Sequence, residues 1–210
     1  EKMATHDALT GLPNRRQLDE QLLLRLAEAG RFGRQVAVLF IDLDNFKQIN
    51  DTLGHPEGDK VLCTIAKRLQ ALVRSADTVA RLGGDEFTIL VEEIQSADDT
   101  IQVAERVHAK LEEPFRLGEH ELFMTSSIGI ALAGSGGEKP ENLLRDADTA
   151  MYRAKAMGRN SFAVFDDEMH KKVVATLLLE KKKYLSCGSS VSSPQESGYI
   201  RRIPGQSQWL

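Results

Sequence analysis

The sequence lacks the features that mark several large classes of protein. It contains only two cysteines, Cys63 and Cys187, which cannot form a disulfide framework and do not have metal-ligand spacing. A reducing, cytoplasmic compartment is therefore expected. The longest unbroken apolar run, from Val36 to Ile41, is far too short to cross a bilayer. The first 13 residues also lack the apolar segment of a signal peptide.

A surplus of positive charge is also missing. The 27 Lys and Arg residues are outnumbered by 31 Asp and Glu residues, which gives a net charge of −4. A general nucleic-acid or anionic-membrane binder would need the opposite balance. What the sequence does contain is 41% apolar residues in a chain of 210, enough for the core of one ordinary domain.

Hydrophobic periodicity predicts alternating helices and strands. Helices are expected over residues 15–29, 46–50, 56–73, 101–111 and 140–157, with Gly30 ending the first and Gly158 capping the last. Strands are expected over residues 35–42, 78–82, 87–92 and 161–165, and a second hairpin within 115–133. Gly83-Gly84 and Gly118-Glu119 are turn signals that make neighbouring strands antiparallel. The predicted fold is α+β, with a central, mainly antiparallel sheet flanked by helices.

The composition changes near the C-terminus. Residues 186–210 contain seven Ser, three Gly and two Pro, which is typical of a linker or a disordered tail. We therefore expect a folded domain over residues 1–167, a linker helix over 168–185 and a disordered tail beyond it.

Two acidic motifs stand where predicted strands end or turn. Asp42-Leu43-Asp44 could place a metal ligand on rigid backbone; equally, Asp44 could cap the next helix and Asp42 simply end the strand. Gly83-Gly84-Asp85-Glu86 suits a hairpin, but a turn does not need two successive carboxylates. With Asp42 they would gather three negative groups around a divalent cation. Hard oxygen ligands favour Mg²⁺ or Mn²⁺, which keep open positions for the phosphates of a nucleoside triphosphate.

Five motifs in order resemble the GGDEF family of diguanylate cyclases. They are Asp7-Ala-Leu-Thr-Gly-Leu-Pro-Asn-Arg15, Phe40-Ile-Asp-Leu-Asp-Asn-Phe-Lys47, Asn50-Asp-Thr-Leu-Gly-His-Pro-Glu-Gly-Asp59, Arg81-Leu-Gly-Gly-Asp-Glu-Phe87 and Asp148-Thr-Ala-Met-Tyr-Arg-Ala-Lys-Ala-Met-Gly-Arg-Asn160. The resemblance covers about residues 5–166. It implies a palm-like sheet similar to that of nucleotide cyclases, and condensation of two GTP into cyclic di-GMP with release of two pyrophosphates.

The resemblance also implies catalytic roles. Asp42 and Asp85 would hold the metal, with the Leu43 carbonyl as a third ligand, and the ion would neutralise charge on the triphosphate. Glu86 would either assist at the 3′-hydroxyl or bind a second metal. Asp44 would support the metal site.

Substrate contacts follow in the same way. Asn50 and Asp59 would read guanine, although an Asn in a turn and an Asp in a first helical turn are common structural features. Lys47, Lys155 and Arg159 would contact the triphosphate, although most such cations are solvated surface residues.

One short motif lies outside this set. Arg74-Ser-Ala-Asp77 stands five residues before Gly83, the offset at which the family places its inhibitory product site. A guanidinium fork suits phosphate oxygens and the O6/N7 edge of guanine, and a carboxylate suits the opposite edge. The plainer alternative is a helix-end Arg followed by a turn Asp.

Three functions remain open from the sequence. The first is an active cyclase that binds GTP and cyclic di-GMP and works as a homodimer, because the 3′-hydroxyl of one nucleotide must meet the α-phosphate of the other. The second is a non-catalytic GTP or cyclic di-GMP binding module, and the third an unrelated metal-dependent enzyme acting within one nucleotide. The resemblance further implies an upstream sensor and, after residues 168–181, a downstream phosphodiesterase domain in the full-length bacterial protein.

Overall fold

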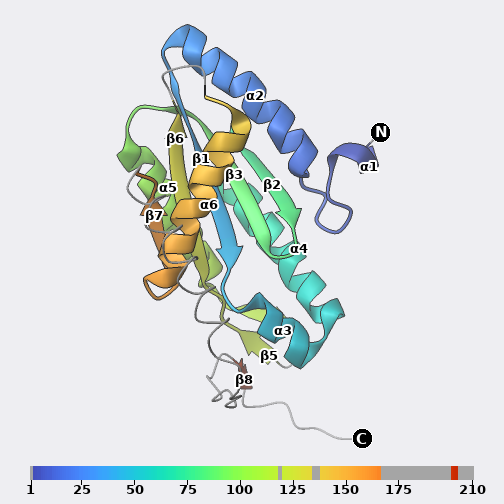
Figure 1. Ribbon diagram of the computed structural model, residues 1–210. Coiled ribbons are helices and arrows are strands. Elements are labelled where there is room, and N and C mark those ends of the chain that lie inside the picture. Colours follow the sequence, from blue (N-terminus) through green and yellow to red (C-terminus); the bar gives the residue numbers. More distant parts are fainter. Residues whose placement is uncertain (1, 118–119, 134–137, 167–199, 203–210) are drawn as a thin grey trace, which may run out of the picture.

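The computed structural model describes residues 2–117, 120–133, 138–166 and 200–202 (Figure 1). The helices are α1 (Lys2–Thr5), α2 (Arg15–Phe32), α3 (Phe46–Leu53), α4 (His55–Leu72), α5 (Ala97–Leu111) and α6 (Pro140–Ala156). The strands are β1 (Gln35–Leu43), β2 (Thr78–Gly83), β3 (Glu86–Ile94), β4 (Phe115–Leu117), β5 (His120–Leu122), β6 (Ser126–Ala133), β7 (Ser161–Val164) and β8 (Ile200–Arg202). Within these residues, no helix is long and apolar enough to cross a membrane.

The central sheet has five strands in the order β2-β3-β1-β6-β7. β1 lies in the middle and pairs antiparallel with both β3 and β6, while β6 and β7 are parallel. β2 and β3 form the hairpin predicted around Gly83-Gly84. The predicted α+β fold with a mainly antiparallel sheet is confirmed.

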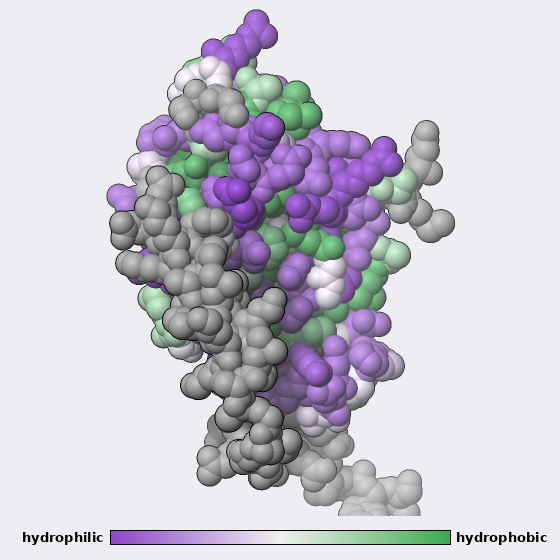
Figure 2. All heavy atoms as spheres, in the orientation of Figure 1, coloured by the Kyte–Doolittle hydropathy of each residue, from purple (hydrophilic) through white to green (hydrophobic). Residues whose placement is uncertain are grey.

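Helices cover both faces of this sheet (Figure 1). Alternate β1 residues Leu39 and Ile41 pack in the cluster that holds the buried residues of α4 and α5. Their neighbours Val38 and Phe40 pack with α2 and α6 on the opposite face. β1 is therefore buried on both sides, which accounts for its continuous apolar sequence. The outer surface over α2 and α6 is predominantly hydrophilic (Figure 2).

Several boundaries differ from those expected. Gly30 does not end α2, which runs to Phe32 and is capped by Gly33 in the left-handed conformation at φ 65°. α3 extends to Leu53, three residues beyond the expected end. At the end of α6, Met157 is the capping residue and Gly158 follows it at φ 120°.

The expected second hairpin does not join the central sheet. β4 and β5 pair with each other, and β5 also pairs with β8 in a separate three-stranded sheet. The turn expected at Gly118-Glu119 and the linker helix expected over 168–185 lie outside the described residues. Of the predicted tail, 186–210, only β8 is described.

A close helix–sheet contact at Gly129 gives a stability prediction. A Cβ atom built on Gly129 in β6 would lie 1.9 Å from the carbonyl oxygen of Ala147 and 2.2 Å from the amide of Met151. Gly129→Ala would push α6 from the sheet, and we expect it to lower the free energy of unfolding by about 3 kcal/mol. Urea unfolding measures this change. The control Ala131→Gly in the same strand should cost only about 1 kcal/mol; equal losses would contradict the prediction.

Candidate active site

The first acidic motif lies at the end of the central strand. Asp42 is opposite Glu86 on β3 and Ser127 on β6, and is only 8% exposed. Its carboxylate forms an ion pair with Lys155 of α6, with 2.7 Å between Oδ1 and Nζ. Residues from three distant parts of the chain therefore meet at one edge of the sheet.

The β2–β3 hairpin brings the second acidic motif to the same edge. Gly83 and Gly84 form the turn at φ 149° and 51°, values that favour glycine. The Leu43 amide donates a hydrogen bond to the Asp85 carbonyl oxygen at 3.3 Å. The structure thus places Asp85 beside the Asp42-Leu43 segment, as the two motifs predicted.

The site carries more negative charge than its own cation neutralises. Burial raises the pKa of Asp42, as do Asp85 and Asp44, while the Lys155 ammonium acts in the opposite direction. Burial likewise raises the pKa of Glu86, and the charges of Asp42, Asp148 and Asp85 raise it further. A bound cation would relieve this repulsion.

The available donors suit a hard divalent cation. The two carboxylates and one carbonyl predicted as ligands are all oxygen donors, which Mg²⁺ and Mn²⁺ prefer. Across the described parts of the chain, no three His, Cys, Asp or Glu side chains form a ready-made metal cage. The predicted set of Asp42, Asp85 and the Leu43 carbonyl does not need one, since Mg²⁺ keeps positions for water and phosphate.

Asp44 has a different role from its neighbour Asp42. Its carboxylate accepts hydrogen bonds from Thr125 Oγ1 at 2.7 Å, Ser127 Oγ at 2.8 Å and the Asn160 amide at 3.1 Å. It is 5% exposed. It does not cap α3, whose capping residue is Asn45. Its carboxylate instead joins β1 to β6 and to the turn after α6.

The residues predicted to read guanine lie on adjacent helices. α3 and α4 meet at Gly54, and the side chain of Asn50 rests on the first turn of α4. A Cβ on Gly58 would lie 1.9 Å from Asn50 Oδ1, so glycine is required for this contact. Asp59 follows Gly58 directly and is exposed. The structure therefore places the Asn50 side chain against the residue that precedes Asp59 in the chain.

The predicted phosphate-binding residues are less uniform in position. Lys155 lies in the site through its ion pair with Asp42. Lys47 is exposed in the first turn of α3, and Arg159 is exposed in the turn after α6. The shared triphosphate role of these three residues stays a prediction.

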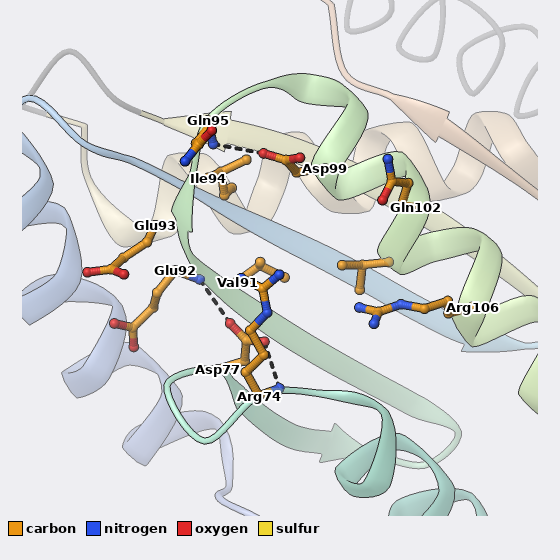
Figure 3. A pocket seen from close by; sticks show the side chains of 11 residues that line it. Arg74, Asp77, Val91, Glu92, Glu93, Ile94, Gln95, Asp99, Gln102 and Arg106 are labelled. Atoms are coloured by element: carbon orange, nitrogen blue, oxygen red, sulfur yellow. Dashed lines mark hydrogen bonds between the residues drawn. The ribbon is translucent and has the colours of Figure 1, made fainter.

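The predicted inhibitory pair lines a pocket of about 320 Å³ (Figure 3). Asp77 accepts hydrogen bonds from the amides of Arg74 at 3.0 Å and Glu92 at 3.2 Å, so its carboxylate also supports the local backbone. Arg106 of α5 reaches the same pocket. Glu92, Glu93 and Asp99 contribute negative charge to its lining.

Comparisons with known proteins identify the family of this chain. The family model described as "Diguanylate cyclase, GGDEF domain" matches residues 4–161. The chain belongs to the GGDEF family. It is 46% identical to the diguanylate cyclase TpbB of Pseudomonas aeruginosa over 75% of this chain and 37% of TpbB. It is 44% identical to MucR of the same organism, named a bifunctional diguanylate cyclase/cyclic di-GMP phosphodiesterase, over 80% of this chain and 24% of MucR.

Solved structures of GGDEF domains show the same fold. The GGDEF domain of P. aeruginosa TpbB has a TM-score of 0.77 at 42% identity, covering 80% of this chain and 98% of that one. The GGDEF domain of DgcB from Caulobacter crescentus, in complex with c-di-GMP, has a TM-score of 0.72 at 30% identity over 77% of this chain and 93% of that one. This chain therefore spans 37% of the length of TpbB and 24% of the length of MucR.

An arginine clamp in this GGDEF domain has no role assigned from the sequence. Arg81 is 9% exposed and binds both Asp7 carboxylate oxygens, at 2.9 and 3.0 Å. Its Nε and second terminal nitrogen donate to the Gly84 carbonyl oxygen at 3.1 and 2.6 Å. Asp7 also accepts from the amide and hydroxyl of Thr10. The N-terminal turn, which includes Asp7, is thereby joined to the hairpin that carries the signature carboxylates.

The clamp predicts a pH-dependent stability term. Burial alone would raise the pKa of Asp7, but the bonds from Thr10 and Arg81 hold that pKa below its usual range. The ionised Asp7 carboxylate therefore makes its full contribution to the free energy of unfolding at neutral pH. That contribution is lost as the pH falls through the lowered pKa. We expect Asp7→Asn to cost about 1–2 kcal/mol at pH 7 and much less near pH 2.5. Urea unfolding at both pH values tests this; an equal cost at both would contradict it.

Asp148 opens the last of the five motifs, but no role was predicted for it from the sequence. Its charge raises the pKa of Glu86, which places it electrostatically at the site. It precedes Lys155 by seven residues in α6. Since residues seven apart share a helix face, this spacing could have identified it.

Proposed function

We propose that this domain is a diguanylate cyclase that condenses two GTP molecules into cyclic di-GMP and releases two pyrophosphates. The observation that carries this proposal is the meeting of Asp42, Asp85 and Glu86 beside Lys155 at one sheet edge. A relay module would not need all three carboxylates. The naming of TpbB as a diguanylate cyclase supports the same activity.

Asp42, Asp85 and the Leu43 carbonyl would hold Mg²⁺ or Mn²⁺. When bound, that cation would neutralise charge developing on the triphosphate. Lys155 would then turn from Asp42 toward phosphate oxygens, and Lys47 and Arg159 would add positive charge. Glu86 would accept the proton of the 3′-hydroxyl or bind a second cation.

Asn50 and Asp59 would select the base. A carboxylate accepts hydrogen bonds from the N1–H and exocyclic amine of guanine, a pair of donors that adenine lacks. Each domain would hold one GTP, so the two reacting nucleotides meet only when two copies face each other. A homodimer is therefore part of the proposal, and an upstream sensor or downstream phosphodiesterase domain would act on it in a longer protein.

A second function has one observation in its favour. NbdA of P. aeruginosa and PdeR of Escherichia coli are both 38% identical to this chain, and both are named cyclic di-GMP phosphodiesterases. This favours a non-catalytic module that binds GTP or cyclic di-GMP as the alternative. Incubation with GTP and Mg²⁺, with products resolved by mass, separates the two functions. Cyclic di-GMP supports the cyclase, whereas saturable GTP binding without product identifies the module.

Product feedback through Arg74 and Asp77 is the remaining part of the proposal. The guanidinium would bind phosphate or guanine oxygens of cyclic di-GMP, and Asp77 would bind its N1–H and amine. The pocket lies at the opposite end of β3 from Glu86, so bound product would act through that strand or hold two domains apart.

Arg74→Ala is expected to weaken cyclic di-GMP binding by about 2–5 kcal/mol, because one partner of a charged contact is lost. Isothermal titration with cyclic di-GMP measures the loss. Progress curves with added product should stall early for the unaltered domain and continue for the variant. Arg116→Ala, a change at an exposed arginine outside the pocket, is the control. Equal stalling of all three proteins would contradict the feedback site.

A further inference from the structure

The turn after α6 has an unusual backbone. Gly158, Arg159 and Asn160 follow one another at φ 120°, 64° and 42°. Glycine adopts such values freely and asparagine tolerates them, but for arginine the left-handed region is strained. A strained residue persists only where its surroundings determine the conformation.

Two acidic residues from distant elements hold this turn through Asn160. The Asn160 amide donates to Asp44 Oδ2 at 3.1 Å, and Asn160 Nδ2 donates to Glu112 Oε1 at 2.9 Å. Asp44 stands at the end of β1 and Glu112 caps the end of α5. The turn is therefore fixed relative to both the sheet and the opposite helix layer.

The Asp44 anchor is itself firmly placed. Thr125 and Ser127 donate to its carboxylate, and its own amide donates to the Thr125 carbonyl oxygen at 3.0 Å. Because Asp44 lies two residues after Asp42, the Asn160 contact sets the distance between the carboxylate site and the turn. Arg159 lies between this fixed residue and the end of α6.

We propose that Asp44 and Glu112 are positioning residues that hold Asn160 and so keep Arg159 in the conformation needed to bind the GTP triphosphate. This inference rests on the proposed function, in which Arg159 is a phosphate ligand. Through Asn160, Asp44 thus acts on the phosphate-binding turn as well as lying beside the proposed metal ligand Asp42. Glu112 contributes from the exposed surface, outside the carboxylate site.

The test uses 3′-deoxy-GTP with Mg²⁺, a nucleotide that cannot react because it lacks the attacking hydroxyl. Arg159→Ala and Asn160→Ala are each expected to weaken its binding about tenfold, and the double variant should be no weaker than either. Glu112→Ala should weaken binding about threefold, while Glu112→Gln, which still offers an oxygen acceptor, should bind normally. In turnover assays, Asn160→Ala and Glu112→Ala should each raise the KM for GTP and leave kcat largely unchanged.

Each outcome decides the proposal. Glu112 is exposed, so the Glu112→Ala and Glu112→Gln pair remains informative if Asn160→Ala unfolds. The positioning proposal would be overturned if Glu112→Ala and Asn160→Ala bind the nucleotide normally. It would also be overturned if the losses of affinity multiply in the Arg159→Ala/Asn160→Ala double variant. Neither result would contradict the proposed cyclase function. Normal binding by Arg159→Ala would also overturn the positioning proposal, because there would be no phosphate contact to position. Absence of saturable nucleotide binding by the unaltered domain would instead refute the proposed function, and this inference with it.

Discussion

Asp85→Ala is expected to lower cyclic di-GMP synthesis by at least about 10³-fold while leaving the fold intact. The substitution removes a proposed metal ligand at the β2–β3 turn. It keeps the carbonyl oxygen that accepts a hydrogen bond from the Leu43 amide, so the local backbone is retained. Product formation from GTP and Mg²⁺, quantified by mass spectrometry, gives the rate.

The matched control for this loss is Glu105→Ala, which removes an exposed carboxylate from α5. It should preserve both activity and thermal stability. If Asp85→Ala makes cyclic di-GMP at a rate near that of the unaltered domain, the assignment of Asp85 to the metal is wrong. A large drop in the melting temperature of Asp85→Ala would indicate a structural role instead.

The unaltered domain is expected to prefer GTP over ATP by up to about 10⁴-fold, and Asp59→Ala should remove most of that preference. A site that hydrogen-bonds a particular group rejects an analogue lacking it, because the polar atoms of the site are then left unpaired. Asp59 is exposed near the start of α4 and directly follows Gly58, which the Asn50 side chain contacts. Dissociation constants for both nucleotides measure the preference.

Asp51→Ala is the matched control, since it removes an exposed carboxylate from the neighbouring helix α3. Its GTP-to-ATP ratio should equal that of the unaltered domain. Equal affinity of the unaltered domain for the two nucleotides would mean that Asn50 and Asp59 do not read the base. A loss shared by Asp51→Ala would point to general electrostatics rather than to base recognition.

The main elements of the fold could be predicted because their signals are local. The apolar run of β1 and the Gly83-Gly84 turn both appear in a few adjacent residues. The end of α2 was predicted wrongly at Gly30, because a glycine inside a helix and one at its end look alike until the chain conformation is known. In the structure Gly33, not Gly30, adopts the left-handed cap.

The site was only partly predictable, because several of its contacts join residues that are far apart in the sequence. The motifs predicted which carboxylates form the site, but not that Lys155 pairs with Asp42. The contact between Asn160 and Glu112 joins residues 48 positions apart, and it depends on how α5 and α6 pack. The requirement for glycine at position 129 likewise arises only where α6 approaches β6.

The Arg81 side chain ties the N-terminal turn to the β2–β3 hairpin. Arg81 binds Asp7 and Gly84 with one guanidinium, and its amide donates to the Pro13 carbonyl oxygen at 2.9 Å. Separating the turn from the hairpin would break both hydrogen bonds between Arg81 and Asp7 and the bond from the Arg81 amide to Pro13. If the segment before α2 moves, the β2–β3 hairpin is therefore expected to move with it. A force applied to the chain at Asp7 would therefore be transmitted through the Arg81 hydrogen bonds to the hairpin that carries Asp85 and Glu86.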